Sequence, residues 1–188
     1  MREEILELLK STNRVNILDF VNYLENETDF FTAPASTKYH GSFEGGLAKH
    51  SYNVYYNLYQ LLTIEPFSKF NFDFDSVIIC ALLHDLCKTN LYKVSMRNKK
   101  NEYGRWVQEP FYETDDQEPY GHGEKSVMLV EKFITLSDEE RYAIRWHMGA
   151  WDDSARSNGA INKAFQKYPL ALALHIADMM DANMGESK

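Results

Sequence analysis

The chain has 188 residues, of which 44% are apolar and 26% are charged; these values are typical of a folded domain and exclude a disordered or fibrous protein. Its formal net charge of −8 excludes a broad basic surface for duplex DNA or an anionic membrane, but not local contacts with phosphate. The longest uninterrupted apolar run, Val77–Leu83, is far shorter than a membrane span, so we expect no membrane contact.

Two short amphipathic helices are predicted within residues 2–26, because apolar residues recur there at spacings of three and four. The first of them carries Glu3 and Glu4 where a secretion signal needs an apolar stretch, and this favours a cytoplasmic location. Residues 32–46 are rich in Ser, Thr, Pro and Gly, which indicates a loop before the next helix.

The next two predicted helices carry polar residues at core positions. A one-sided helix begins at Leu47, and His50 lies on its apolar stripe, so that its imidazole is expected to face the core. Residues 75–88 are apolar on nearly all sides, as in a central buried helix. Towards its end this helix contains His84 and Asp85, and a buried aspartate is costly unless it is paired or bound to a cation.

Both cysteines of the chain also fall on the predicted helix at residues 75–88. Cys80 and Cys87 lie seven residues apart, which places their Cα atoms about 10 Å from each other at a rise of about 1.5 Å per residue. That separation is too long for a disulfide. The reducing cytoplasm is therefore the expected location.

Residues 93–120 interrupt the helical pattern as a polar insertion rich in Tyr, Trp, Asn and turn-forming residues. Within it, Tyr103–Gly104 fits the turn of a short β-hairpin. Helical patterns return over residues 124–133, 137–148 and 168–184.

The helix over residues 137–148 has clear end signals, since Ser137 and Glu140 have capping-box spacing and Gly149 is placed to end it. Neither an internal repeat nor a shift in composition divides the chain. We therefore predict a single, all-α domain over residues 1–188.

Imidazoles and carboxylates on separate predicted helices point to a metal site. Any one inward histidine is more often a hydrogen-bonded core residue, but a carboxylate buried without a partner costs several kcal/mol. Helical bundles build metal sites from such side chains on facing helices. Imidazole and carboxylate ligands together suit a divalent transition metal such as Mn, Fe, Ni, Co or Zn. The candidate residues are His50, His84, Asp85, His122, His147 and Asp178.

The order of these residues, and the stretches around them, resemble a known family. The segments YHGSFEGGLAKH (residues 39–50), ALLHDLCK (81–88) and LHIADMMDA (174–182) are similar to the HD-domain superfamily of metal-dependent phosphohydrolases, and in particular to the HD domain of bacterial 3′-to-5′ exoribonucleases. The resemblance covers about residues 37–185. It implies an HD-domain helical bundle, with the N-terminal helices at residues 2–26 packed on it.

The resemblance also implies a chemistry for the candidate residues. A first metal would be bound by His50, His84, Asp85 and Asp178, and Asp85 would bridge to a second metal completed by His122 and His147, so that one or two metals bind per chain. A metal-activated water would then cleave a phosphoester in a phosphorylated small molecule, such as a nucleotide, or in a short single-stranded nucleic acid. With one metal, His122 would instead be a substrate contact or a general acid. Asp85 and His122 are thus also expected to act in catalysis.

Lys88 and the basic stretch that follows it are predicted to bind substrate. On a helix, Lys88 would share a face with His84, so that its ammonium could reach a phosphate at the metal; the alternative is a solvated lysine at a helix end. Between Lys88 and Arg105 there are six basic residues and one acid. We expect Arg97 and Arg105 to contact the phosphorylated substrate, although such a stretch is more often simply a solvated loop.

Two other functions stay open at this point. Some HD proteins with the same ligand set resemble di-iron oxygenases, which would cleave a bond with O₂ rather than with water. A non-catalytic, metal-stabilised nucleotide-binding module is the other alternative. The sequence does not predict the oligomeric state. It also leaves open whether Asp181, one turn after Asp178, orients a ligand.

Overall fold

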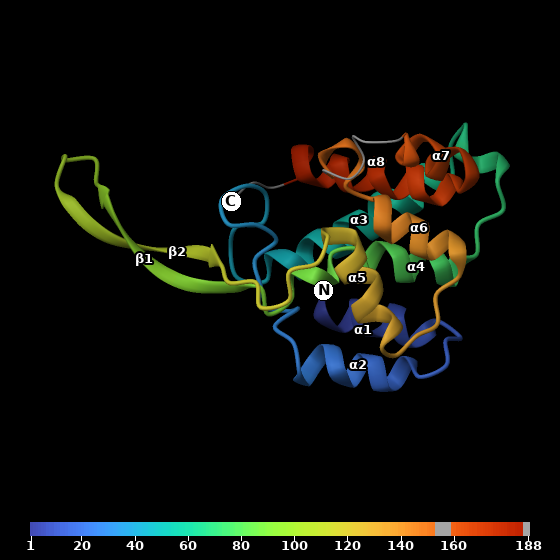
Figure 1. The fold of residues 1–188 in the computed structure, drawn as a ribbon, viewed down its shortest axis with the longest axis horizontal. Helices are drawn as coiled ribbons and strands as arrows, with labels where there is room; N and C mark the ends of the chain where they lie inside the picture. The colour runs from blue at the N-terminus through green and yellow to red at the C-terminus, as the bar shows by residue number, and fades with distance from the viewer. Residues whose placement is uncertain (153–158, 186–188) are drawn as a thin grey trace.

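Helices make up most of the computed structural model, which describes residues 1–152 and 159–185 (Figure 1). The remainder of the predicted single domain, residues 153–158 and 186–188, lies outside the described residues. The α-helices are α1 (Arg2–Ser11), α2 (Ile17–Asn26), α3 (Gly46–Leu62), α4 (Phe74–Leu83), α5 (His122–Glu131), α6 (Asp138–Trp146), α7 (Ala160–Lys167) and α8 (Pro169–Met184). Strands β1 (Tyr92–Lys100) and β2 (Trp106–Thr114) form one antiparallel sheet. The predicted helical fold with a β-hairpin is confirmed.

Helix α4 lies at the centre of the helical body. It starts where the carboxylate of Asp73 accepts a hydrogen bond from the backbone N–H of Ser76, and every residue from Ser76 to Leu83 is buried. Helices α1, α3, α6 and α8 pack around it. This surrounding explains why the sequence of α4 is apolar on all sides.

The predicted helix over residues 75–88 is wrong at its end, because α4 stops at Leu83. Asp85 has a non-helical backbone (φ −103°, ψ 20°), and a short 3₁₀ turn, η2 (Leu86–Lys88), follows it. The backbone N–H of Cys87 donates to the hydroxyl of Ser126 on α5, 3.1 Å away, instead of continuing the helix. The turn after Leu83 thus presents two polar residues, His84 and Asp85, at the end of the most buried helix.

The helices after the hairpin differ from the prediction in extent and number. Helix α5 starts at His122, two residues before the predicted start, and α7 was not predicted. The capping box of α6 is confirmed, since the side chains of Ser137 and Glu140 each accept a hydrogen bond from the other's backbone N–H. Helix α8 matches its predicted range to within one residue.

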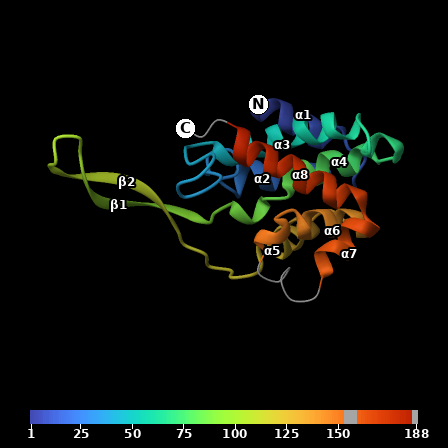
Figure 2. The same ribbon diagram turned by 90° about the horizontal axis from the view of Figure 1, so that it is seen from above.

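The β-hairpin extends away from the helical body, as Figures 1 and 2 both show. Each strand has nine residues, longer than the short strands predicted, and the register runs from Tyr92 opposite Thr114 to Lys100 opposite Trp106. The turn between the strands contains Gly104 with a left-handed backbone (φ 72°), as expected for this Tyr-Gly pair.

Helices α1 and α2 lie against the body and share its core, to which Ile5, Leu9 and Phe20 contribute fully buried side chains. The segment between these two helices is tied to α6 by an ion pair between Arg14 and the fully buried carboxylate of Glu140. Within residues 1–152 and 159–185, no helix combines the length and the apolar composition needed to cross a membrane.

Candidate metal centre

Five elements bring the six predicted metal ligands together in one buried cluster. His50 comes from α3, His84 and Asp85 from the end of α4, and the others from the start of α5, the end of α6 and the middle of α8. His50 Nε2 lies 3.2 Å from both His84 Nε2 and Asp178 Oδ1. All six residues are buried except His122, whose side chain is 29% exposed.

Asp85 lies at the middle of the cluster, and its two carboxylate oxygens face different histidines. Oδ2 lies 3.4 Å from His50 Nε2 and 3.5 Å from His84 Nε2. Oδ1 lies 2.7 Å from His122 Nε2 and 3.3 Å from His147 Nε2. Asp85 therefore contacts two pairs of histidines, His50 and His84 with one oxygen and His122 and His147 with the other.

Hydrogen bonds on the outer side of the rings aim the Nε2 atoms of three histidines into the cluster. The Nδ1–H of His84 donates to the carbonyl of Ala81 at 2.8 Å, and that of His147 donates to the carbonyl of Ile144 at 2.6 Å. Both carbonyls are three residues upstream, at the end of the helix that carries the histidine. His50 Nδ1 lies 2.7 Å from Asp181 Oδ2. Such bonds fix the tautomer that leaves Nε2 free to bind a cation.

The electrostatics of the cluster favour a cation. Burial, with smaller effects from its charged neighbours, lowers the pKa of His84 to about 3, so that its imidazole is neutral at pH 7. Burial raises the pKa of Asp178, but the hydrogen bond from His50 outweighs it, and the pKa falls below its ordinary value. For Asp85, burial is likewise outweighed, mainly by Lys88 and His84, and its pKa is lowered. Burial also lowers the pKa of His122, whereas the contacts of His50 with Asp178, Asp181 and Asp85 outweigh burial and raise its pKa, so that a metal would have to displace a proton from His50. Metal binding requires neutral imidazoles and ionised carboxylates.

An unsatisfied atom gives a direct test of whether these residues fit a metal. Among the described residues, the buried Nε2 of His147 has no hydrogen-bond partner, although Asp85 Oδ1 is 3.3 Å away. Buried polar atoms rarely stay unpaired in folded proteins. Three groups of possible ligand atoms, each within 4.8 Å of one another, occur here: His50–His84–Asp85, His84–His147–Asp178 and Asp85–Cys87–His122. The donor set fits one or two divalent transition metals.

Lys88 lies at the cluster, but on a different element from the one that the sequence predicted. Because α4 ends at Leu83, Lys88 is not on the same helix as His84; it belongs to η2 and its Nζ lies 2.6 Å from Asp85 Oδ2. Burial lowers the pKa of Lys88, but the carboxylate of Asp85 raises it above its ordinary value. An ammonium that is only 12% exposed therefore lies beside the central carboxylate.

Arg97 and Arg105 do not join the cluster. Arg97 lies on β1, five residues beyond Tyr92 and so about 16 Å further along the strand at about 3.3 Å per residue, and its guanidinium pairs with Glu109 at 2.6 Å. Arg105 lies in the turn at the far end of the hairpin, which points away from the helical body (Figure 1). Basic composition alone could not reveal that the stretch folds outward.

Other residues near the cluster were not in the predicted ligand set. Asp181 contacts His50 and also accepts a hydrogen bond from Asn53 at 2.8 Å. The Sγ of Cys87 lies 3.2 Å from His122 Nδ1, and burial raises the pKa of this thiol to about 12. The ring of His40 lies 4.9 Å from that of His50. For Asp181 the sequence contained a signal, its position one turn after Asp178.

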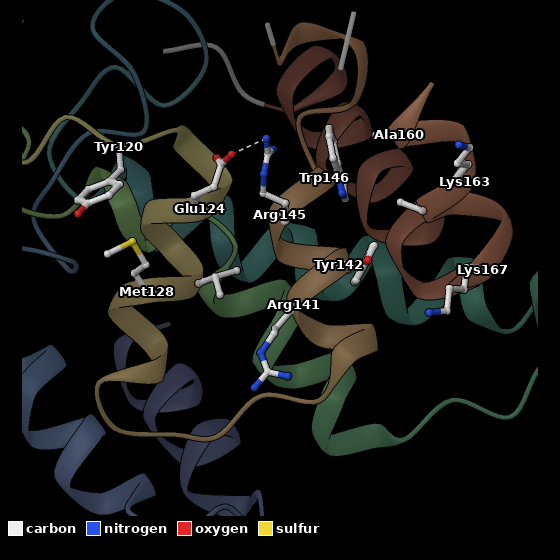
Figure 3. Close-up of a pocket in the computed structure, with 12 residues that line it drawn as sticks. Tyr120, Glu124, Met128, Arg141, Tyr142, Arg145, Trp146, Ala160, Lys163 and Lys167 are labelled. Atoms are coloured by element: carbon white, nitrogen blue, oxygen red, sulfur yellow. Dashed lines mark ion pairs between the residues drawn. The ribbon is translucent and has the colours of Figure 1, made fainter. Parts of the chain in front are cut away.

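A cavity of about 760 Å³ lies outside the cluster, between α5, α6 and α7 (Figure 3). Its walls include Val127, Met128, Tyr142 and Trp146, and an ion pair of 2.5 Å joins Glu124 to Arg145 beside it. On α5 and α6 these residues occupy the helix faces opposite those that carry the buried residues of the core. The cavity therefore lies on the outer side of α5 and α6, away from the buried cluster.

The comparisons with known proteins agree with this geometry. A family model described as the HD domain matches residues 47–183, which is well over half of the chain and includes all six clustered residues. No curated protein and no solved structure matches the chain, so nothing links it to the HD domains of exoribonucleases in particular. Proteins of this family are generally metal-dependent hydrolases, and the cluster of imidazoles and carboxylates is consistent with that chemistry. The chain belongs to the HD domain family.

Proposed function

We propose that this protein is a metal-dependent phosphohydrolase that cleaves a phosphoester of a nucleotide or of a short single-stranded nucleic acid. The observation that carries the proposal is the position of Asp85, whose two oxygens face His50 and His84 on one side and His122 and His147 on the other. Such sharing of one carboxylate is suited to holding cations beside a phosphoryl group.

The residues that would hold the metal follow from the contacts. His50, His84, Asp85 and Asp178 would bind one divalent cation, and Asp85, His122 and His147 would bind a second where two are present. A bound cation supplies Lewis acidity to a phosphoryl oxygen and lowers the pKa of a water. Mn, Fe, Ni, Co and Zn all suit these ligands.

Two residues of the chain have the right position to act on the substrate. Lys88 remains protonated beside Asp85, and its ammonium attracts the negative charge of a phosphate towards the centre. His122 is the most exposed member of the cluster. In a site with one cation it contacts the leaving group as proton donor; in a site with two it is a ligand.

Metal analysis and turnover test the proposal together. The purified protein is expected to contain one or two transition metals per chain and, when supplied with that metal, to release product from bis(p-nitrophenyl) phosphate, from nucleotides or from a short oligonucleotide. A His84→Ala/Asp85→Ala variant should lose both metal and turnover, while Asp138→Asn, at an exposed position on α6, should keep both. Full activity of the double variant would reject the proposal.

The central position of Asp85 also fits the oxygenase alternative, because a pair of irons would use the same shared carboxylate. That function predicts activity with iron alone, lost when oxygen is removed. Phosphate release supported by Mn or Co under nitrogen would exclude it. Metal binding without turnover of any substrate would favour a nucleotide-binding module instead.

A further inference from the structure

A second cavity lies between the β-hairpin and the loop that precedes α3. Its volume is about 420 Å³, within the range of about 300–1,000 Å³ that is usual for ligand sites. Thr37, Lys38 and Ser42 of the loop form one wall, and residues of β1 and β2 form the other. Figures 1 and 2 both show this loop beside the end of the hairpin that joins the helical body. The hairpin therefore forms one side of a cavity as well as extending from the body.

The walls of this cavity are basic, although the chain as a whole is acidic. Three basic residues and one acid line it, a net charge of +2 compared with −8 for the chain, and these are Lys38, Arg97, Lys99 and Glu109. Glu109 pairs with Arg97 at 2.6 Å and with Lys99 at 3.0 Å, so that one carboxylate is shared between two cations. Lys38 adds a positive charge from the loop on the other side. Basic walls in an acidic protein concentrate an anionic ligand.

The other groups in the cavity suit a phosphate and a base. Thr37 and Ser42 carry hydroxyls, which can donate hydrogen bonds to phosphate oxygens. On the hairpin, the guanidinium of Arg97 lies over the ring of Phe111, 5.3 Å from its centroid. Unpaired bases stack on aromatic rings and on guanidinium planes of this kind. The cavity therefore combines the two kinds of contact by which proteins bind single-stranded nucleic acid.

The loop that forms one wall is held in place by its own hydrogen bonds. The backbone N–H of Ala35 donates to the carbonyl of Gly41 at 2.9 Å, and the hydroxyl of Ser36 donates to the carbonyl of His40 at 2.9 Å. Gly41 has a left-handed backbone (φ 60°), a conformation that favours glycine. A wall held in this way loses little conformational freedom when a ligand binds.

Both walls continue to the metal centre. In the loop, His40 comes two residues after Lys38, and its ring lies 4.9 Å from the ring of His50. In the hairpin, β1 begins four residues after Lys88, which lies at the centre. Arg97 is about 16 Å beyond the start of β1, at about 3.3 Å per residue. A strand that stacks at about 3.4 Å per nucleotide covers this distance with ~five nucleotides, whereas a mononucleotide does not.

We propose that this cavity binds a phosphate of a single-stranded nucleic acid, several nucleotides away from the phosphoester held at the metal centre. This binding deepens the proposed function, on which it rests, because it narrows the substrate from a nucleotide or a strand to a strand. It also gives Arg97 a contact with the substrate at a distance from the metals. Contacts with phosphates and with the faces of bases do not depend on base sequence.

Fluorescence anisotropy tests the proposal. The probe is a 5′-fluorescein-labelled oligothymidylate of about ten nucleotides with phosphorothioate linkages, which resist hydrolysis, and the full chain is used with its metal. The dissociation constant is expected to rise with salt, because bound phosphates release counterions. Thymidine monophosphate cannot span the two sites, so it should compete about tenfold more weakly, or less well still, than the unlabelled strand.

The variant Lys38→Gln/Lys99→Gln removes one cation from each wall and keeps the pair of Arg97 with Glu109. It should weaken binding of the strand by about tenfold or more, and should reduce the slope of log K against log salt by about 1.4, because each phosphate contact contributes about 0.7. The matched control, Lys10→Gln/Lys69→Gln, removes the same charge from exposed positions on α1 and on the 3₁₀ turn η1 (Phe67–Lys69), and should bind like wild type. Circular dichroism and metal content should be unchanged in both variants.

An equal loss of affinity in both variants overturns the proposal, as does no loss in either. A wild type that hydrolyses bis(p-nitrophenyl) phosphate but does not bind the strand also overturns it, and leaves the proposed function intact, because this small substrate needs only the metal centre. Thymidine monophosphate that competes as well as the strand overturns it too, and assigns the cavity to a nucleotide. A strand bound through Lys38 and Lys99 by a protein without turnover supports the cavity as a nucleic-acid site and contradicts the hydrolase.

Discussion

The histidines of the metal centre owe their orientation to groups outside the cluster. For His84 and His147 these groups are backbone carbonyls, which no substitution removes. For His50 the group is the carboxylate of Asp181, 2.7 Å from Nδ1. A negative charge at this position both fixes the ring and makes Nε2 a stronger donor to a cation.

We therefore predict that Asp181→Asn weakens metal binding by about tenfold to a hundredfold while the protein stays folded. The amide keeps the size of the side chain and removes its charge. Competition with a chelating dye measures the affinity. Asn183→Ala is the control, because Asn183 lies two residues further on α8, is exposed, and donates a hydrogen bond to the carbonyl of Met179 on the same helix. Unchanged affinity in Asp181→Asn would contradict the assigned role.

His84 should make the metal-free protein sensitive to acid. Its pKa is about 3 in the folded protein, chiefly because of burial, and 6.5 is the ordinary value. Between these two values the unfolded chain binds a proton that the folded chain does not bind, so the free energy of unfolding falls as the pH falls from 6.5 towards 3. At pH 5 the loss from this residue is about 2 kcal/mol relative to pH 7.

Urea unfolding of chelator-treated protein at pH 7 and pH 5 measures this loss. The wild type is expected to lose about 2 kcal/mol more stability between these pH values than His84→Gln, which has no proton to bind at this position. His50, whose pKa is raised because its contacts with Asp178, Asp181 and Asp85 outweigh burial, acts in the opposite direction and is present in both proteins. If wild type and His84→Gln lost the same stability between pH 7 and pH 5, His84 would not be held neutral in the folded protein.

At the level of elements, the sequence best predicted the helices whose apolar composition reveals that they are buried. Helix α4 is apolar on all sides and α8 is a long apolar segment, and both were predicted within a few residues at their starts. The end of α4 was not predictable, because the hydrogen bond from Cys87 to Ser126 joins it to a helix 39 residues away. Helix α7 has only eight residues, of which Ala164 alone is buried, so it carries little apolar pattern.

The residues of the metal cluster could also be predicted from the sequence. Each predicted ligand occupies a core position or a helix end, and the family resemblance supplied their association. The positions of the basic residues around the cluster could not be predicted in this way. Charge predicted a substrate contact for Arg97, but its position depends on the direction of the hairpin, which no local pattern encodes. Lys88 reaches Asp85 only because α4 ends early.

The contact between α5 and α6 depends on Gly123. A Cβ atom added there would overlap the carbonyl oxygen of Arg145, so the two helix backbones touch at this glycine. Gly123 directly follows His122, and Arg145 lies two residues before His147. The distance between these helices therefore sets how far His122 and His147 stand from Asp85.

We predict that Gly123→Val separates α5 from α6, lowers stability by about 1–3 kcal/mol and reduces the metal content. If the protein binds two metals, the one held by His122 and His147 should be lost first. Metal analysis and thermal unfolding measure the two effects. Met128→Val, on the outer face of α5, is the control and should behave like wild type. A Gly123→Val protein with full metal content would show that the helices tolerate the separation.

Across the whole molecule, the cluster joins parts of the chain that are far apart in sequence. His50 and Asp178 are 3.2 Å apart in space, and helices α4, α5, α6 and α7 lie between them in the chain. A cation bound to these two residues and to His84, at the end of α4, would link α3, α4 and α8 directly. Because the unfolded chain cannot assemble these ligands, binding of the metal stabilises the fold as a whole.

We accordingly predict that adding the cognate metal to chelator-treated protein, at about one hundred times its dissociation constant, raises the free energy of unfolding by about 2.7 kcal/mol. For a chain of this size the melting temperature should then rise by about 5–11 °C. Asp85→Asn should abolish the shift, because Asp85 contacts both histidine pairs, whereas Asp138→Asn on the surface of α6 should keep it. An undiminished shift in Asp85→Asn would show that the cation does not depend on the carboxylate at the middle of the cluster, and would contradict the assigned position of the metal.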